Sequence, residues 1–138
     1  MLNINEVIKI NKRNMENKKY VPDSLSKSDK KKQIKSIKDK KERPKLKSFE
    51  SKRSPWVKKF EDKYGFKITN DSRISKEIIS KTGINKILDR GVAAYYNSGS
   101  RPNQTPASWS RARLASVILK GPAYKIDKEI FEKYKKWL

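Results

Sequence analysis

The aromatic side chains of this sequence are concentrated in its second part, and this limits where a core can form. Of the 13 Phe, Trp and Tyr residues, 2 lie within residues 1–55 and 11 lie within residues 56–138. The second part, of about 80 residues, is long enough for a small and marginal hydrophobic core. The first part combines low hydrophobicity with high charge, as do segments that stay disordered or become ordered on a partner. We therefore expect a mainly α protein, with a basic arm, extended or partly helical, over residues 1–54 and a small helical domain over residues 55–138.

The chain carries a large excess of positive charge along its whole length. It has 36 Lys and Arg against 15 Asp and Glu, which is a formal net charge of +21. Residues 1–55 hold 18 basic and 7 acidic groups, and residues 56–138 hold 18 and 8. Self-repulsion at this charge opposes compaction unless an anionic partner neutralises it. Nucleic acid, an acidic protein surface and an anionic membrane are the candidate partners.

The residue types that are absent exclude several kinds of site. The chain has no Cys and no His, so it can form no disulfide, no zinc site of the usual ligands and no Cys–His or Ser–His nucleophilic pair. Its carboxylates and serines form no recognisable catalytic dyad, and a general base would have to be a perturbed carboxylate or lysine. We therefore expect no enzyme, no cofactor, no metal site and no small-molecule substrate. The lack of a long apolar run also predicts no membrane span and no signal peptide at the N-terminus.

Residues 20–54 are expected to hold one helix between extended segments. The pattern Ser26-x-x-Asp29 resembles a capping box in which Asp replaces the preferred Glu. A helix would run from about Lys27 to Lys40, but its apolar residues, Ile34 and Ile37, form too narrow a stripe to fold it alone. The segment is either a solvated lysine face or an arm that becomes ordered on phosphate or on an acidic neighbour. The length of the basic run favours the arm.

Start and stop signals predict several short helices in the second part. Ser54 and Pro55 open the first helix, and Gly65 has the place of a left-handed stop. The other expected elements are, in order, a β-like stretch over Phe66–Thr69, a turn over Asn70–Ser72, a helix over Ser75–Thr82 that ends at Gly83, a helix over Ile84–Arg90 that ends at Gly91, and a helix from Pro106 to about Leu119. The two helices joined at Gly83 resemble a helix-turn-helix, although any small helical domain shows this pattern.

The last helix has the clearest start signal. Asp127 would be its N-cap, and Ile126 and Phe131 would form a hydrophobic staple across it. The spacing i, i+4 and i+7 would place three apolar side chains on one face of this helix, namely Ile130, Tyr134 and Trp137.

Arginine replaces lysine in one stretch of the second part. No lysine lies between Lys86 and Lys120, where the chain has four arginines. Arginine is favoured where a planar group must hold a carboxylate or phosphate in two bonds, or stack on a ring. Arg111 and Arg113 lie about 200° apart around a helix, so they cannot face one target side by side. Cations early in a helix oppose its dipole. We therefore expect their charge to be compensated, either by a partner or by an acidic side chain such as Asp89 or Asp127.

Two interpretations of this stretch stay open. The N–H groups of the helix that starts after Thr105 can form an anion site with Arg101 and Arg111. Alternatively, Arg101 lies in a salt bridge within the domain. For Tyr95 and Trp109 we favour a place in the core over a role as base-stacking platforms. The full set of candidate nucleic-acid or anion-binding residues is basic: Lys30, Lys31, Lys32, Lys35, Lys38, Lys45, Lys47, Lys52, Arg53, Arg101, Arg111 and Arg113.

Several stretches together resemble a family of viral proteins. They are Tyr20–Gln33, Arg43-Pro44, Ser51–Ser54, Ala94–Pro106, Ser108-Trp109 and Ala112–Ser116, of which SGSRPNQTP is the most specific. On these residues, the chain resembles an uncharacterised family of small basic proteins encoded by large DNA viruses of algae and protists and by some marine phages. The resemblance implies a viral origin and supplies no catalytic residues, because the family has no established activity. It also implies that the basic segment over residues 20–54 follows a defined path over a partner.

We therefore expect a non-enzymatic viral structural protein, a minor capsid or virion component. It would be located in the virion, or otherwise in the host cytoplasm or nucleus. The helical domain would dock on acidic surfaces of capsid or other virion proteins, and the arm would extend along capsid subunits or toward packaged double-stranded DNA. The alternative is a nucleic-acid-binding protein for genome packaging or transcription. A regulator of a host or viral enzyme is the third hypothesis.

Overall fold

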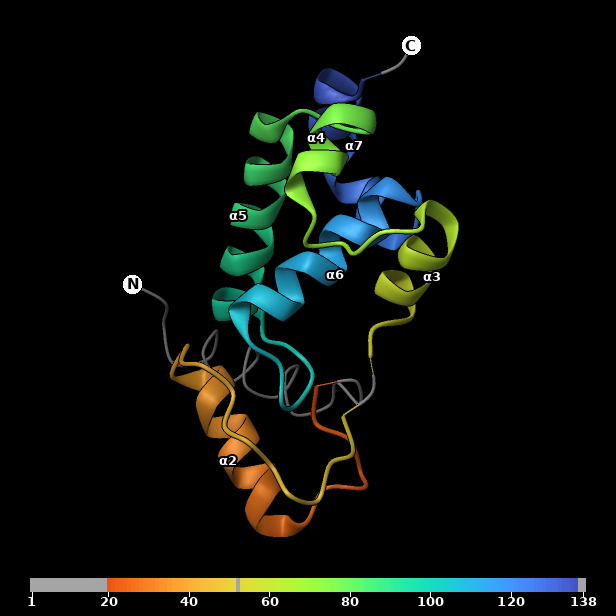
Figure 1. Cartoon of the computed structure of the whole chain (residues 1–138). Coiled ribbons are helices and arrows are strands. Elements are labelled where there is room, and N and C mark those ends of the chain that lie inside the picture. The colour runs from red at the N-terminus through yellow and green to blue at the C-terminus, as the bar shows by residue number, and fades with distance from the viewer. Residues whose placement is uncertain (1–19, 52, 137–138) are drawn as a thin grey trace, which may run out of the picture. The chain divides into compact units, whose positions relative to one another are not determined.

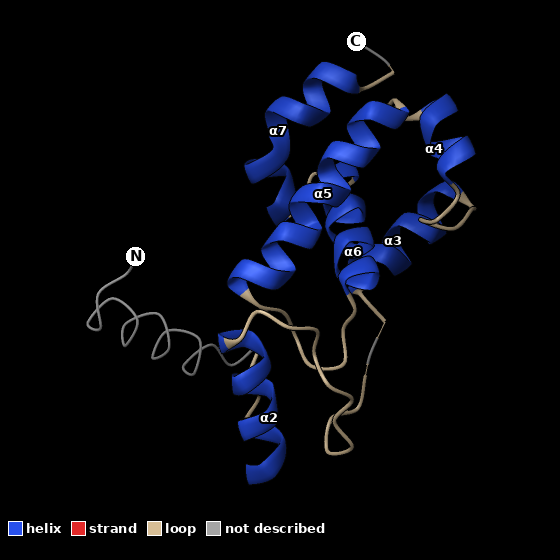
Figure 2. Ribbon diagram, turned by 90° about the vertical axis from the view of Figure 1, so that its left-hand side faces the viewer, coloured by secondary structure: helices blue, strands red, loops and turns tan. Residues whose placement is uncertain are grey.

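The computed structural model describes residues 20–51 and 53–136, and these are mainly helical (Figure 1). In this part of the chain the helices are α2 (Lys27–Lys38), α3 (Pro55–Tyr64), α4 (Asp71–Glu77), α5 (Lys81–Ser98), α6 (Pro106–Ile118) and α7 (Pro122–Tyr134). The described residues contain no named strand, only an isolated antiparallel bridge between Ile79 and Lys135 (Figure 2). The predicted mainly α fold is confirmed.

The described residues divide into two compact units. Unit 1 consists of residues 20–51 and 94–105, and unit 2 consists of residues 53–93 and 106–136. The division after residue 51 lies close to the expected boundary at 54, but residues 94–105 belong with the first segment instead of the second. The segment expected to be an arm is therefore one part of a discontinuous folded unit.

Unit 2 is built around a hydrophobic core to which its helices contribute. Helix α6 packs against both α3 and α7. The core side chains with no exposed surface are Phe60, Ile74, Ile79, Ile84, Ile87, Leu114, Ala115 and Val117. The start and stop signals of α3 are confirmed, because Pro55 is its first residue and Gly65 ends it with φ 75°.

Helix α5 corrects the prediction of two short helices separated by glycines. It runs unbroken from Lys81 to Ser98, so Gly83 and Gly91 lie inside it and the helix-turn-helix interpretation is wrong. Both glycines are points of close packing. A Cβ atom on Gly83 would lie 2.6 Å from Cβ of Tyr134, and one on Gly91 would lie 2.7 Å from Cα of Ser110 on α6. Glycine is needed here because a neighbouring side chain at Gly83, and the backbone of α6 at Gly91, approach closely, and not because of a turn.

The segment before α5 also differs from its prediction. Helix α4 begins at Asp71 because the Asn70 side chain accepts a hydrogen bond from the backbone N–H of Arg73 as an N-cap. The helix ends at Glu77, well before Gly83. Phe66–Thr69 forms no strand. The expected turn over Asn70–Ser72 is in fact the start of the helix.

Helix α7 begins earlier than predicted. Its N-cap is Gly121, followed by Pro122, and Asp127 lies inside the helix at a kink with φ −103° and ψ 16°. A second helical segment starts at this kink, as predicted, but the Asp127 carboxylate binds Arg90 and Arg113 instead of capping the segment. The predicted staple is wrong, because Ile126 is 62% exposed. Trp137, which was expected on the core face, lies outside the described residues.

Unit 1 has a smaller core, formed around α2. The predicted capping at Ser26 is confirmed, because its side chain accepts a hydrogen bond from the N–H of Asp29. After α2 the chain turns at Lys40, with φ 55°, and runs back along the helix (Figure 1). The buried apolar side chains of this unit are Val21, Leu25, Ile37, Leu46 and Tyr95.

Candidate polyanion-binding surface

One face of α2 is buried in unit 1. The buried positions are Asp29, Gln33, Ser36 and Ile37, whose spacing of i, i+4, i+7 and i+8 defines a single side of a helix. Three of these four side chains are polar, so this face is held by hydrogen bonds as much as by apolar packing. The rest of the helix surface is free to carry charge.

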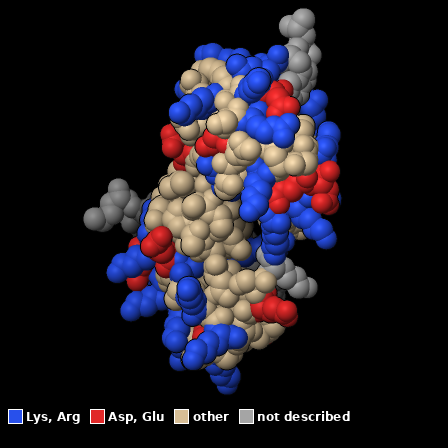
Figure 3. Space-filling view, viewed as in Figure 1, with Lys and Arg blue, Asp and Glu red and all other residues tan. Residues whose placement is uncertain are grey.

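The opposite face of α2 carries a row of lysines, which we call the lysine ridge: Lys27, Lys31, Lys35 and Lys38. All four are exposed. At about 100° per residue, they lie within about 80° of one another around the helix, on the side away from Gln33. The ridge is about 16 Å long, at about 1.5 Å per residue. In the space-filling view, basic side chains crowd the region of α2 (Figure 3).

Of the predicted binding residues on α2, the structure places Lys31, Lys35 and Lys38 on the ridge. Lys32 is exposed beside it, whereas Lys30 is partly buried. Lys27 was missed by sequence reasoning, although its position four residues before Lys31 is the signal that could have identified it.

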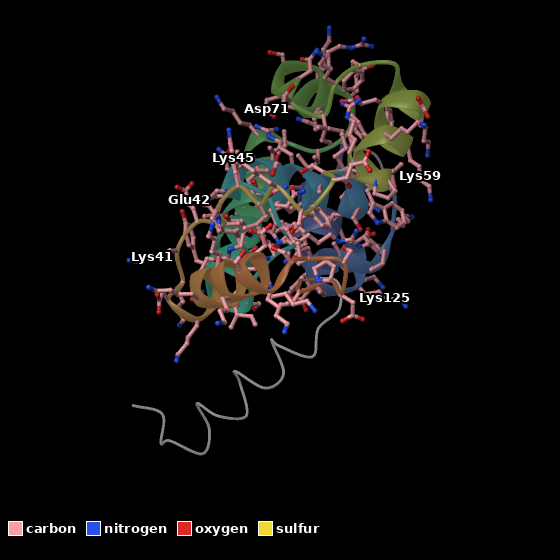
Figure 4. All side chains as sticks on the ribbon, turned by 90° about the horizontal axis from the view of Figure 1, so that it is seen from below. Lys41, Glu42, Lys45, Lys59, Asp71 and Lys125 are labelled. Carbon is pink, nitrogen blue, oxygen red and sulfur yellow. The ribbon has the colours of Figure 1, made fainter. Side chains whose placement is uncertain are left out.

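More lysines follow in the segment after α2. The predicted residues Lys45 and Lys47 are exposed, as are Lys40 and Lys41, which were not predicted. Lys41 and Lys45 are labelled in Figure 4. A shallow depression of about 250 Å³ lies between the helix and this segment. It is lined by Lys32, Lys35, Ser36, Asp39, Lys41, Glu42 and Pro44. The carboxylates of Asp39 and Glu42 weaken the positive potential at the C-terminal end of the ridge, where Lys35 also lines the depression.

The basic segment is held in place by residues 99–104, which we call the clasp loop. Gln33 on α2 donates hydrogen bonds from Nε2 to the carbonyl of Ser100 (3.0 Å) and to that of Tyr20 (2.9 Å). Asn103, at φ 62°, accepts from the N–H of Leu46 at 2.7 Å and donates to the carbonyls of Leu46 and Phe49, each at 3.3 Å. The SGSRPNQTP sequence therefore binds the basic segment within unit 1.

Tyr95 and Arg43 extend this attachment into the core of unit 1. The Tyr95 hydroxyl accepts from the N–H of Arg43 at 2.6 Å and donates to the carbonyl of Gln104 at 2.9 Å. The Arg43 guanidinium lies 4.7 Å from the centre of the Tyr95 ring and donates to the carbonyl of Ser36 in the last turn of α2. A cation is favourable at a helix C-terminus. Burial nevertheless lowers the pKa of Arg43, and its Nε and Nη1 atoms have no hydrogen-bond partner among the described residues.

Asp29 is the one carboxylate within α2, and it is used inside the unit. It accepts hydrogen bonds from the hydroxyl and the N–H of Ser48, the latter at 3.0 Å. These bonds, with the hydroxyl bond as the largest cause, lower the pKa of the Asp29 carboxyl below its ordinary value. Its charge is therefore directed toward the returning segment and does not lie among the lysines of the ridge.

The arginines of α6 are held by carboxylates within unit 2. Arg111 forms two hydrogen bonds to Asp71, at 2.6 and 3.2 Å. Arg113 forms two to Asp127, at 2.7 and 3.0 Å, and Arg90 reaches the same carboxylate at 3.0 Å. The prediction that Asp127 compensates an arginine of this helix is confirmed. Asp71 as the partner of Arg111 was not predicted.

The remaining predicted residues lie in different places. Arg53 is paired with Glu61 in unit 2, and Lys52 lies outside the described residues. Arg101 is exposed in unit 1 and forms no ion pair with a described residue, so a buried salt bridge does not account for it. Arg101 and Arg111 belong to different units. An anion site that combines them stays a prediction.

The two aromatic residues that were expected in a core, Tyr95 and Trp109, differ in burial. Tyr95 has no exposed surface, so its predicted place in a core is confirmed. Trp109 on α6 is half-buried. The ridge itself consists of lysine alone.

Other types of site find no support in the described part of the chain. It contains no cluster of three or more acidic side chains that could hold a metal ion. None of its helices combines the length and the apolar character that crossing a membrane requires. The remaining chemical feature of the described surface is its positive charge.

Comparison with known proteins identifies the family and nothing more specific. A family described as a family of unknown function (DUF5824) matches residues 4–133. No curated protein and no solved structure matches the chain.

Proposed function

We propose that this chain, which belongs to the family of unknown function DUF5824, is a non-enzymatic structural component of a virus particle that binds an anionic partner through the lysine ridge of unit 1. The observation that carries the proposal is the ridge itself. Four exposed lysines are aligned on a helix whose opposite face is attached to its own unit by hydrogen bonds. A surface of this kind is maintained against its own repulsion when an anionic partner covers it.

The viral part of the proposal rests on the resemblance of the sequence. Most of the stretches that resemble proteins of large DNA viruses and marine phages lie in unit 1, whereas Ser108-Trp109 and Ala112–Ser116 lie in unit 2. Those in unit 1 include Tyr20, Gln33, Arg43 and the clasp loop, which hold one another by hydrogen bonds. The resemblance therefore concerns mainly the residues that present the lysine ridge. A location in the virion, in contact with capsid proteins or the packaged genome, is consistent with this arrangement.

A structural role agrees better with the side chains than a catalytic one. The strongly held carboxylates, Asp71 and Asp127, are each bound by the guanidinium groups of arginines. A carboxylate that is held in this way has its oxygens directed at the guanidinium group instead of at the proton of a substrate. The chain also has no histidine.

Mass spectrometry of gradient-purified virions tests this proposal. We expect the protein to co-purify with intact particles at a constant copy number relative to the major capsid protein, and to remain after surface proteolysis if it lies inside the shell. Its absence from purified particles, together with its presence in infected cells, would overturn the virion role and favour a packaging or transcription factor.

A further inference from the structure

We infer that the lysine ridge binds the phosphate backbone of double-stranded nucleic acid without reading the base sequence. The inference rests on the proposed function and names the partner of the same surface. It commits to nucleic acid and not to an acidic protein surface. It is carried by three features of the described residues: which cations are left unpaired, which side chains surround them, and where the nearby carboxylates point.

The first feature is a division of roles between arginine and lysine. Five of the described arginines pair with carboxylates, namely Arg53, Arg73, Arg90, Arg111 and Arg113. Arg43 is buried over the Tyr95 ring. Among the described lysines, by contrast, Lys135 alone forms an ion pair with a described residue. The positive charge that unit 1 offers to a partner is therefore mainly carried by lysine ammonium groups.

The second feature is the composition of the exposed face of α2. It consists of the four ridge lysines with Ser28 and Lys32. Protein interfaces are depleted of lysine at their centre and depend on buried aromatic or arginine anchors, and this face has neither. Phosphate oxygens, in contrast, are commonly contacted by lysine and serine side chains. The face therefore suits a phosphate backbone better than an acidic protein.

The same composition predicts that binding is independent of sequence. Base edges in the major groove are read by bidentate groups, chiefly arginine to guanine and asparagine or glutamine to adenine. The described arginines are largely engaged elsewhere, and Gln33 is buried with its Nε2 bonded to two carbonyls. A lysine ammonium is a flexible point charge and lacks the planar fork with which arginine fixes its position on a base edge.

The third feature is the placement of the acidic groups. Asp29 is directed to Ser48, on the side away from the ridge. Asp39 and Glu42 lie at the C-terminal end of α2, in the shallow depression that the ridge residue Lys35 lines with Lys32 and Lys41, so they reduce the positive potential at that end of the ridge only. Duplex DNA carries about one charge per 1.7 Å of its axis, so a length of about 16 Å presents about nine charges. Each of the four ridge lysines can therefore contact a phosphate of its own, because the phosphates outnumber the lysines.

The test measures binding of the full chain to two short DNA duplexes of unrelated sequence, by fluorescence anisotropy across about 50 to 200 mM salt. We expect both duplexes to bind equally, with affinity falling steeply with salt. The ridge variant carries Lys27→Gln, Lys31→Gln, Lys35→Gln and Lys38→Gln. It should reduce the slope of log affinity against log salt by about 3.6, at about 0.9 per lost phosphate contact. Four contacts correspond to about a hundredfold change in affinity across this salt range.

A matched control separates the ridge from total charge. Lys58→Gln, Lys76→Gln, Lys125→Gln and Lys128→Gln remove the same charge from exposed lysines of unit 2. We expect this variant to keep most of the slope. Because glutamine and lysine have similar helix propensity, circular dichroism should be unchanged in both variants. If the ridge variant loses helix, the pair Lys31→Gln and Lys35→Gln should still reduce the slope by about 1.8.

Several results would overturn the inference and leave the proposed function standing. Equal losses in the ridge and control variants would assign binding to net charge instead of the ridge. Binding to poly-glutamate at affinities that exceed those for both duplexes would identify an acidic protein surface as the partner. A strong preference for one duplex would contradict sequence independence. Absence from virions, with duplex binding intact, would instead remove the proposed function and keep the ridge as a DNA-binding surface.

Discussion

Unit 1 and unit 2 are both strongly basic, but different interactions stabilise them. In unit 2 the described residues include 18 basic and 8 acidic groups, and all five arginines pair with carboxylates. In unit 1 they include 12 basic and 5 acidic groups, and neither of the two arginines pairs with a described carboxylate. In unit 2, Asp71 and Asp127 form ion pairs with arginines of other helices. Unit 1 is instead held by hydrogen bonds to backbone carbonyls, and its described lysines form no ion pair with a described residue.

The difference suggests that the two units have different roles. A larger hydrophobic core and internal ion pairs make unit 2 a stable scaffold, because the charges of its arginines, although not those of most of its lysines, are compensated within the unit. Unit 1 has fewer buried apolar side chains, and its lysine surface is uncompensated. We expect unit 2 to resist perturbation of charge outside its ion pairs, and unit 1 to be the unit whose stability depends on a partner.

The largest expected effect comes from removing the central ion pair of unit 2. Asp127→Asn would leave Arg113, which is 16% exposed at its side chain, without its carboxylate. Breaking a buried pair by removing one partner costs about 3–5 kcal/mol, and we expect a loss of this size in chemical denaturation followed by tryptophan fluorescence. The control is Asp89→Asn on the exposed surface of α5, which should change stability by less than about 0.5 kcal/mol. Equal effects of the two substitutions would show that ion pairs do not hold unit 2.

The second largest effect is expected in unit 1 and not in unit 2. Asn103→Ala removes the hydrogen bonds of the clasp loop to Leu46 and Phe49. It also places alanine at φ 62°, a conformation that it adopts less readily than asparagine. We expect unit 1 to lose about 1–3 kcal/mol, measured as faster hydrogen exchange over residues 20–51.

Hydrogen exchange in unit 2 should be unchanged by this substitution if the units are stabilised independently. Asn97→Ala, at an exposed position of α5, is the matched control and should leave exchange unaltered in both units. A uniform increase in exchange across the chain would instead show that the two units unfold together.

A smaller effect tests the role of the glycines in α5. Gly91→Ala would place a Cβ atom 2.7 Å from Cα of Ser110. Overpacking costs about 1–3 kcal/mol, and the better helix propensity of alanine returns about 1 kcal/mol. We therefore expect a net loss of up to about 2 kcal/mol in thermal unfolding. Asn85→Ala on the exposed face of the same helix should be neutral or slightly stabilising, and a similar gain at Gly91 would contradict close packing at this site.

The smallest effect is a pH dependence confined to unit 1. The bonds from Ser48 lower the pKa of Asp29 in the folded unit, so the carboxylate contributes stability above its unfolded pKa of about 3.9. This contribution is lost as the pH falls through the lowered folded pKa. NMR titration of the residues around Ser48 should show unit 1 loosening at acid pH, and Asp29→Asn should remove that transition. An unchanged transition in the variant would assign the acid sensitivity to other groups.

The success of the sequence predictions depended on how far apart the interacting residues are. The capping of α2 by Ser26 and the start and stop of α3 were predicted correctly, because a cap depends on residues within one turn of it. The lysines of the ridge could be identified for the same reason, since helical periodicity alone places them on one side. Even Lys27 could have been found by extending that periodicity by one turn.

Interactions between residues that are far apart in the sequence could not be predicted from local patterns. Gly83 and Gly91 have the local form of helix stops, but packing against Tyr134 and Ser110 determines their role. Asp127 has the local form of an N-cap, but the arginines of α5 and α6 bind it inside a helix.

By itself, the sequence determined the helical class, the local caps, the net charge and the absence of cysteine and histidine chemistry. These follow from composition and from neighbours along the chain. Only the tertiary structure decided that residues 94–105 join the basic segment, that the arginines of α6 are bound internally, and that the lysines of α2 are left on the surface. The physical reason is that each of these outcomes depends on a partner brought close by folding, and one carboxylate or one carbonyl can satisfy only the donors that the fold places beside it.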